Sequence, residues 1–224
     1  MGSLNQAQQS ILNGSLLGDG NLRLAKGKLN ALFEVNHTVK QKLYVDWKYE
    51  NFKSFVLTGP KARKGNGARI AYRFTTQSLP VFTSVYKRFY QNNHKVIPAD
   101  LKLDPLALAV WFMDDGSKSR SSVYLNTQQF SLEDQAKLLN ILKKEFNLIG
   151  KLNKDKYYFR IRITTESTQS LKNIIRPHVL PLFSYKLGDD PVTTDSKEEI
   201  RPKDRMNNTP TLIIEQQAME FPNS

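Results

Sequence analysis

The sequence predicts an α/β (α+β) chain built from two pseudo-symmetric αββαββα repeats, and two observations carry this prediction. The first is a pair of similar segments: residues 12–20 read Leu-Asn-Gly-Ser-Leu-Leu-Gly-Asp-Gly, and residues 108–116 read Leu-Ala-Val-Trp-Phe-Met-Asp-Asp-Gly. Each is an apolar, helix-like run that ends in an acid before a glycine, and the two acids, Asp19 and Asp115, lie 96 positions apart. The second observation is that a similar order of strands and helices follows each segment.

The spacing of apolar residues predicts the elements that follow the first segment. They are, in order, an extended stretch over 21–38 with a break near Gly27, a helix over 39–56, an alternating strand over 69–76 and a helix over 79–91. In the alternating strand, one side holds Ile70, Tyr72 and Phe74, and the other holds Arg69, Arg73 and Thr75. Pro80 suits the first turn of the last helix, where its missing N–H is not needed.

The second segment is followed by the same order. The expected elements are an extended stretch over 123–128, a helix over 131–146, an alternating strand over 159–164 and a helix over 168–178. Asp104 and Pro105 fit the cap and first position of the second segment's helix, and Ser131 can cap the next helix. We expect the first repeat to cover residues 7–98, the second 104–187, and a loose C-terminal extension 188–224, which is rich in Pro, Asn, Thr and acids.

Composition excludes several classes of protein. The chain has no cysteine, so disulfides, thiolate zinc sites and cysteine nucleophiles are all absent. The longest apolar run, 106–113, is too short to cross a bilayer, so no membrane partner is expected. Residues 1–183 hold 28 Lys and Arg against 13 Asp and Glu, whereas residues 184–224 hold 5 against 8. A body this basic attracts polyanions such as nucleic acid, and a reducing intracellular compartment fits the missing cysteines.

The two similar segments also suggest chemistry. Two carboxylates delivered by two helix ends can hold divalent metal between them, which suits phosphodiester hydrolysis. The segments resemble the LAGLIDADG motif of homing endonucleases, and residues 10–187 are similar in layout to the single-chain, two-motif, intron-encoded branch of that family. The phrase Trp-Phe-Met-Asp-Asp-Gly at 111–116 is an especially close match. One motif alone is a weak signal, but two that are each followed by the same strand order are specific.

The resemblance implies how the motifs are used. In the family, the two motif helices pack side by side at the centre, and antiparallel, saddle-shaped sheets lie on DNA. Gly14 and Gly18 supply a small face for this contact, whereas the second helix has Val110 and Asp114 at the matching places, which predicts looser or offset packing. Asp19 and Asp115 are the implied metal ligands. Gly18 and Asp114 directly precede them and belong to the same metal site, although the Asp114 side chain points about 100° round the helix and matches a non-catalytic position.

Further catalytic residues are implied by position in the motif pattern. A polar residue on the second strand of each half positions water near the metal, and the matching residues are His37 and Gln128, with a register that can slip by one residue. A lysine that follows the last helix of each half flanks each site, and the matches are Lys95 and Lys186. Such a lysine can stabilise the charge of the transition state. A structural histidine and solvated surface lysines are the alternatives.

The alternating strands predict a nucleic-acid surface. If their apolar sides pack on the helices, the arginines of the other side point outward together, namely Arg69, Arg73, Arg160 and Arg162. Arg23 and Arg120, expected on the first strand of each half, can join them. A two-stranded ribbon fits the major groove of DNA, where arginine reads guanine with two hydrogen bonds. An ordinary polar sheet face is the competing interpretation.

Three functions compete. The leading one is a monomeric, Mg²⁺-dependent DNA endonuclease, with Mn²⁺ or Ca²⁺ able to occupy the same sites, that cuts both strands of a long double-stranded target and leaves short 3′ overhangs. The second is an RNA maturase on the same fold, with the host intron RNA as partner. The third is a nuclease of another fold, because Asp46-Trp47-Lys48 fits the acid-x-Lys part of a restriction-enzyme motif, although it lies in a helical pattern. The resemblance further implies a mitochondrial or chloroplast location.

Overall fold

Each half of the chain contributes one four-stranded antiparallel sheet, and in both sheets the four strands, counted along the chain, lie in the order first, second, fourth, third. The computed structural model describes residues 2–25, 27–65, 67 and 69–188. The expected C-terminal extension, 188–224, lies outside the described residues apart from Gly188. The predicted α/β fold of two αββαββα repeats is confirmed, and we propose 7–98 and 104–187 as the boundaries of these repeats.

The first half holds these elements: α1 (Gln6–Leu17), β1 (Asn21–Leu24), β2 (Ala31–Thr38), η1 (Val39–Gln41), α2 (Lys42–Phe52), η2 (Lys53–Phe55), β3 (Lys61–Lys64), β4 (Ile70–Thr75), α3 (Pro80–Phe89), β5 (Tyr90–Gln91) and β6 (His94–Lys95). The expected helix over 39–56 is thus an α-helix with a 3-10 turn at each end. Asn5 caps α1 by a capping box with Gln8, and Pro80 is the first residue of α3, as its sequence position predicts.

The second half repeats the order: α4 (Pro105–Asp115), β7 (Gly116–Lys118), β8 (Val123–Leu125), α5 (Leu132–Phe146), β9 (Gly150–Asp155), β10 (Tyr158–Ile163), α6 (Thr165–Ile175), η3 (Arg176–His178), η4 (Pro181–Phe183) and α7 (Ser184–Leu187). Both predicted caps are present, since the Asp104 side chain accepts from the Ala107 N–H and the Ser131 side chain accepts from the Asp134 N–H. No helix among the described residues is long and apolar enough to span a membrane.

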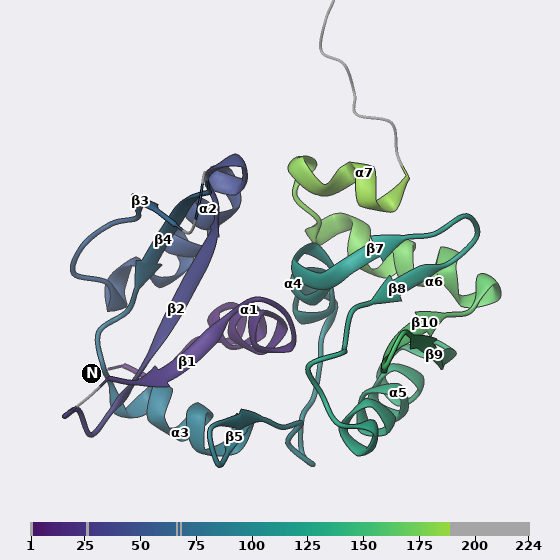
Figure 1. Cartoon of the computed structure of the whole chain (residues 1–224), viewed down its shortest axis with the longest axis horizontal. Coiled ribbons are helices and arrows are strands. Elements are labelled where there is room, and N and C mark those ends of the chain that lie inside the picture. Colours follow the sequence, from purple (N-terminus) through teal and green to yellow (C-terminus); the bar gives the residue numbers. More distant parts are fainter. Residues whose placement is uncertain (1, 26, 66, 68, 189–224) are drawn as a thin grey trace, which may run out of the picture. The chain divides into compact units, whose positions relative to one another are not determined.

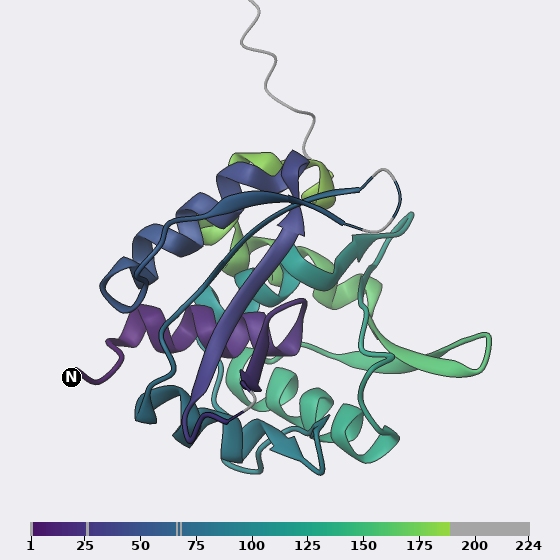
Figure 2. The ribbon, with the colours of Figure 1, turned by 60° about the vertical axis from the view of Figure 1, so that its left-hand side comes forward.

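One face of each sheet packs on helices and the other is open. In Figure 1, α1 and α4 lie next to each other between the two sheets, and Figure 2 shows the first sheet in front of α1 and α2. Ile161 and Ile163 of β10 are fully buried on the helix side, while Arg160 and Arg162 alternate with them toward the open face. The predicted alternation of β10 therefore matches the burial of its side chains.

The contact between α1 and α4 is closer than the sequence predicts. A Cβ atom on Gly14 would lie 2.3 Å from the Ala107 carbonyl oxygen, and one on Gly18 would lie 2.4 Å from the Asp114 Cβ. The expectation of looser or offset packing is wrong, because the two glycines of α1 accommodate the larger Val110 and Asp114 of α4. Residues 107–113 of α4 are all buried, which is typical of a helix surrounded by protein.

This contact predicts that Gly14→Ala destabilises the protein. The added methyl has no room beside the Ala107 carbonyl, and overpacking of a core typically costs about 1–3 kcal/mol. Urea unfolding measures the loss. Gly59→Ala is the matched control, because a Cβ there would lie 3.7 Å from the nearest atom, the Tyr49 hydroxyl oxygen. Equal unfolding midpoints for the two variants would show that α1 and α4 are farther apart.

Candidate active site

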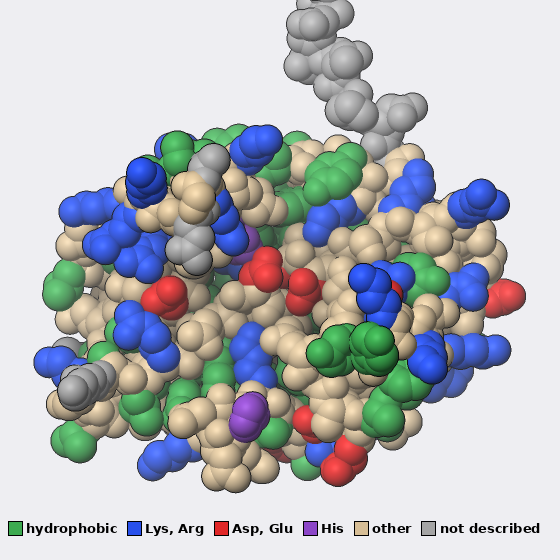
Figure 3. All heavy atoms as spheres, in the orientation of Figure 1, with side chains coloured by type: hydrophobic (Ala, Val, Ile, Leu, Met, Phe, Trp, Pro, Cys, Tyr) green, Lys and Arg blue, Asp and Glu red, His purple; other side chains and the backbone are tan. Residues whose placement is uncertain are grey.

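The two acids of the motifs lie at the C-terminal ends of the central helices. Asp19 follows the cap residue Gly18 of α1, and its side chain is half exposed. Asp115 is the last residue of α4, and its own carbonyl oxygen accepts hydrogen bonds from the backbone and side-chain N–H groups of Asn126. Figure 3 shows acidic side chains at the centre of this face, over the helix ends, with Lys and Arg side chains over both sheets around them.

The carboxylates at this site repel one another. Burial, followed by the charge of Asp114, raises the pKa of Asp19. Burial, followed by the charges of Asp19 and Asp114, raises the pKa of Asp115 to about 7. A divalent cation prefers carboxylate oxygens as ligands, and its charge would offset this repulsion. The donor set of Asp19 and Asp115 therefore fits a hard divalent cation such as Mg²⁺.

A lysine lies at the end of each motif helix. Lys95 Nζ donates to the carbonyl oxygens of Gly18 (3.0 Å) and Gly20 (2.8 Å). Lys186 Nζ donates to those of Met113 (2.7 Å) and Asp114 (3.4 Å). Burial lowers the pKa of Lys95 to about 8 and also lowers the pKa of Lys186, and in both cases the acids of the site oppose the shift. The two lysines thus occupy equivalent places in the two halves.

A tight hairpin positions Lys95. Strands β5 and β6 pair through Tyr90 and Lys95, and the two residues between the strands, Asn92 and Asn93, both have positive φ (49° and 63°). Two adjacent residues with positive φ form a type I′ turn, for which asparagine is a favoured residue. The turn reverses the chain directly after α3, so that β6 returns toward the end of α1.

His37 lies between two of the acids. Its side chain is 3% exposed, its Nδ1 is 3.7 Å from Asp19 Oδ2 and its Nε2 is 3.8 Å from Asp114 Oδ1. Burial, followed by the charge of Lys48, lowers the pKa of His37 to about 4, so the imidazole is neutral at pH 7. The strand β2 thus brings a polar side chain to the end of α1, where the sequence pattern places it.

In the second half, two adjacent glutamines make different contacts. The Gln128 side-chain amide donates to Asp155 Oδ2 (3.2 Å), which belongs to the β9–β10 hairpin. The Gln129 amide instead donates to the Leu17 carbonyl oxygen (3.2 Å), at the end of α1. The structure therefore brings the Gln129 amide to the end of α1. Gln128 was expected on the second strand of this half, but β8 ends at Leu125, so both glutamines follow the strand.

The sequence pattern does not reveal a second, buried group beneath the acids. The Asp114 side chain is fully buried, and Lys48 Nζ lies 3.1 and 3.2 Å from its two oxygens. The Tyr44 hydroxyl donates to Asp114 Oδ1 (2.7 Å). Asp19, His37 and Asp114 each offer a possible ligand atom within 4.8 Å of the other two, so these three residues could also hold a cation. Because Lys48 already binds both oxygens of Asp114, we regard this carboxylate as a partner of Lys48.

This pairing also excludes the restriction-enzyme interpretation of Asp46-Trp47-Lys48. Asp46 accepts a hydrogen bond from Tyr72 (3.0 Å) and pairs with Lys42 on the outer side of α2. Lys48 points to the opposite side, into the core. The acid and the lysine of this tripeptide therefore do not form one site.

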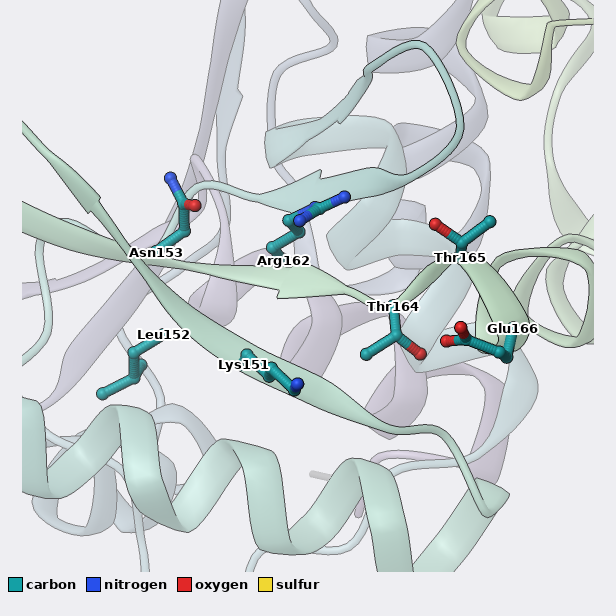
Figure 4. Close-up of a pocket in the computed structure, with 7 residues that line it drawn as sticks. All are labelled: Lys151, Leu152, Asn153, Arg162, Thr164, Thr165 and Glu166. Carbon is teal, nitrogen blue, oxygen red and sulfur yellow. The ribbon is translucent and has the colours of Figure 1, made fainter.

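The open face of the second sheet is basic and hollowed. Figure 4 shows side chains of β9 and β10 around a pocket that continues to the start of α6, with Leu152 directed to the helix side. The pocket is lined by Lys151, Leu152, Asn153, Arg162, Thr164, Thr165 and Glu166. Arg162 Nε donates to Ser122 Oγ (3.1 Å), and the Arg160 guanidinium lies 4.1 Å from the Tyr124 ring centre. Arg160 also donates to Asn126 Oδ1 (3.4 Å) and lies 3.8 Å from Asp155 Oδ2, so its side chain is only 27% exposed.

The first sheet has a comparable pocket, lined by Arg23, Glu34, Thr58, Gly59, Lys61, Arg63, Arg73, Phe74 and Thr75. Arg73 pairs in register with Lys61, as Arg162 does with Lys151 in the second sheet. Arg23 donates to Glu34 (3.0 Å), and Arg73 lies 4.0 Å from the same carboxylate. Both sheets therefore carry a cross-strand Arg–Lys pair on the open face.

Two of the expected surface arginines lie outside the strands. Arg120 was expected on the first strand of its half, but β7 ends at Lys118, so Arg120 lies in the β7–β8 loop. Arg69 immediately precedes β4, and its carbonyl oxygen accepts from the Gly65 N–H. Both are exposed.

Comparison with known proteins gives a consistent picture. The model of the LAGLIDADG DNA endonuclease family matches residues 9–171. The cytochrome b mRNA maturase bI2 of Saccharomyces cerevisiae is 32% identical over 212 residues, which cover 84% of this chain and 49% of the relative. The chain thus spans about half the length of that protein. The probable intron-encoded endonuclease 1 of Wickerhamomyces canadensis is 30% identical over 200 residues, covering 83% of this chain and 85% of the relative.

Among solved structures, the homing endonuclease I-WcaI bound to its DNA recognition sequence superposes with a TM-score of 0.77 at 28% identity. The match covers 84% of this chain and 88% of that protein.

The crowded carboxylates predict a pH-dependent stability in buffer that contains no divalent cation. The pKa of Asp115 is raised to about 7 in the folded state, so protonation of this carboxyl group stabilises the folded state. This contribution is fully present below pH 4 and is lost as the pH rises through 7. Asparagine does not ionise, so Asp115→Asn should raise the unfolding temperature relative to the wild type at pH 8 but not at pH 4. Glu145→Gln, at an exposed position of α5, is the control. A lower unfolding temperature of Asp115→Asn at pH 8 would contradict the repulsion.

Proposed function

Because the chain belongs to the LAGLIDADG DNA endonuclease family, we propose that it is a site-specific, metal-dependent endonuclease that cuts both strands of a long DNA target and leaves short 3′ overhangs. The observation that carries the proposal is the pair of acids at the ends of two tightly packed helices. The basic open faces of the two sheets, which lie beside these helix ends, support it. One chain supplies both acids, so the active form is a monomer with an internal pseudo-dimer.

The site residues divide by role. Asp19 and Asp115 would hold Mg²⁺, with Gly18 and Asp114 beside them in the same site, and Mn²⁺ or Ca²⁺ could take the same ligands. A bound divalent cation supplies an activated water and stabilises the departing 3′ oxygen. Lys95 and Lys186 place a positive charge beside each scissile phosphate, where it stabilises the charge of the transition state.

Water is oriented by polar side chains near the acids. His37, which is neutral at pH 7, can accept a proton from water close to Asp19. In the second half, Gln129 lies nearer than Gln128 to the motif helices, so we assign this role to Gln129 and keep Gln128 as a residue of the surface that meets DNA.

The duplex lies on the two open sheet faces. Phosphate contacts fix the register of a protein on DNA, and contacts to base edges specify the sequence. The arginines available for both purposes are Arg23, Arg69, Arg73, Arg120, Arg160 and Arg162. Glu34 offsets the charge of Arg23 and Arg73 and restrains their guanidinium groups. Because phosphate contacts depend on free positive charge, we expect these two arginines to contact bases and not phosphates.

A second candidate function is that of an intron RNA maturase. The observation that favours it is the relative named as a cytochrome b mRNA maturase. Under this function the partner is the RNA of the host intron, and the protein acts in the mitochondrion or chloroplast. The presence of both motif acids favours DNA cleavage as the primary activity.

Cleavage of a randomised DNA library tests the proposal. The protein is incubated with the library and Mg²⁺, and the cut ends are sequenced. A single long consensus with short 3′ overhangs is the expected result. Uncut DNA together with splicing of a host intron RNA would favour the maturase function.

Substitution of either motif acid should separate cleavage from binding. Asp19→Asn and Asp115→Asn each remove the charge of a metal ligand and leave the sheets unchanged. We expect cleavage in Mg²⁺ to fall by at least about 100-fold while the affinity for the target duplex stays within about twofold. Asp46→Asn, on the outer side of α2, is the matched control. Full activity in either motif variant would remove that acid from the metal site.

Substitution of Arg162 should affect recognition and not chemistry. Arg162→Ala should cost about 1–3 kcal/mol of binding and relax the sequence preference at one or two adjacent target positions, if the guanidinium contacts a base. Arg160→Ala is tested in parallel. An equal loss of affinity for all sequences would assign both arginines to phosphates.

Lys95→Ala and Lys186→Ala should instead slow cleavage with little change in affinity.

A further inference from the structure

We infer that Lys48 is a positioning residue: through the buried Asp114 carboxylate it fixes the backbone of Asp19 to the end of α4, and so sets the relative placement of the two metal-binding acids. This inference rests on the proposed function.

Four contacts converge on one carboxylate. Lys48 Nζ reaches both oxygens of Asp114, at 3.1 and 3.2 Å, and the Tyr44 hydroxyl donates to Oδ1 at 2.7 Å. The backbone N–H of Asp19 donates to Oδ2, at 3.3 Å. These bonds engage both oxygens of the carboxylate and therefore restrain its orientation. The side chains of Lys48 and Asp114 are both 0% exposed, so water does not compete for the bonds between these two residues.

The contacts join the two halves of the chain. Lys48 and Tyr44 lie on α2 and Asp19 follows α1, all in the first half, whereas Asp114 lies on α4 of the second half. Asp114 immediately precedes Asp115. One buried side chain therefore connects the backbone of one metal-binding acid to the residue next to the other.

The buried carboxylate and its lysine occur at only one of the two motif helices. The residue that matches Asp114 in the first motif is Gly18, which has no side chain and leaves the room that the Asp114 side chain fills. On α5, the helix that corresponds to α2, the buried polar residue Gln135 bonds to Thr127 and to the Phe130 carbonyl oxygen, both in its own half. Among the buried polar side chains of α2 and α5, only Lys48 and Tyr44 bond to the other half, and both contact Asp114 of α4.

Stability alone does not account for this ion pair. Taking two charges out of water costs several kcal/mol per ion, and replacing a buried pair with apolar residues of similar volume is often neutral or stabilising. What an apolar pair lacks is a fixed acceptor for the Asp19 N–H. Groups behind a metal ligand that fix its orientation typically change metal affinity or activity by about 10–100-fold when they are removed.

The test removes the ion pair without leaving an unpaired buried charge. The variants are Lys48→Met, the neutral pair Lys48→Met/Asp114→Leu, which also removes the acceptor for the Asp19 N–H, and Tyr44→Phe, which removes one hydrogen bond to Asp114 without a change of charge. Lys42→Met is the matched control, because Lys42 lies on the same helix but pairs with Asp46 at the surface. Four quantities are measured: the unfolding temperature, the affinity for the target duplex, the single-turnover cleavage rate in Mg²⁺, and Mn²⁺ binding by electron paramagnetic resonance.

For Lys42→Met we expect wild-type values throughout. The single variant Lys48→Met should lose stability, and the neutral pair should recover it. In the neutral pair, DNA affinity should stay within about twofold of wild type, while Mn²⁺ affinity and the cleavage rate each fall at least about tenfold. Tyr44→Phe should show the same pattern with a smaller loss.

Wild-type Mn²⁺ affinity and cleavage in a folded neutral pair would overturn the inference, since Lys48 would then serve only to balance charge. If the neutral pair does not fold, Tyr44→Phe decides, and unchanged Mn²⁺ binding and rate in that variant overturn it. If the wild-type protein itself cuts no DNA, the proposed function fails. The Mn²⁺ affinities of the variants then still test the positioning role separately.

Discussion

The close packing of α1 against α4 is the constraint on which the rest of the structure depends. Two glycines of one helix face a valine and an aspartate of the other, so the backbones approach closely along one side. Because each helix ends at an acid, the distance between the helices also sets the distance between Asp19 and Asp115. The sheets are attached to the ends of these helices, so the same contact also fixes the positions of the two open faces relative to the site.

The electrostatics of this arrangement are unfavourable by themselves and are compensated locally. The C-terminal end of a helix carries partial negative charge, so carboxylates there are repelled both by the helix and by one another. Lys95 and Lys186 bind the terminal carbonyl oxygens of the two helices, and Lys48 binds the buried Asp114. Three lysines thus offset three acids, but burial, followed by the repulsion between the carboxylates, still raises the pKa values of Asp19 and Asp115. A divalent cation is the ligand that such a site favours.

Local patterns in the sequence predict the elements and the two acids, because periodicity, caps and motif spacing are properties of short segments. They do not locate β3 and β9, whose sequences Lys-Ala-Arg-Lys and Gly-Lys-Leu-Asn-Lys-Asp lack apolar alternation and form strands only by pairing with β4 and β10. They also miss what depends on two distant segments at once. The fit of Gly18 to Asp114 and the burial of Lys48 are examples, since a lysine in a helical pattern is ordinarily a surface residue.

The two halves are similar in backbone and different in the side chains at the site. His37 stands near Asp19, while Gln129 reaches across to the end of α1 from the other half, and only α4 carries an aspartate before its terminal acid. In a homodimer every such change would occur twice, and an aspartate at both Gly18 and Asp114 would clash and would bury two like charges in contact. A duplication within one chain removes this restriction. The asymmetric ion pair at the centre is therefore a feature that a single-chain architecture permits and a symmetric dimer does not.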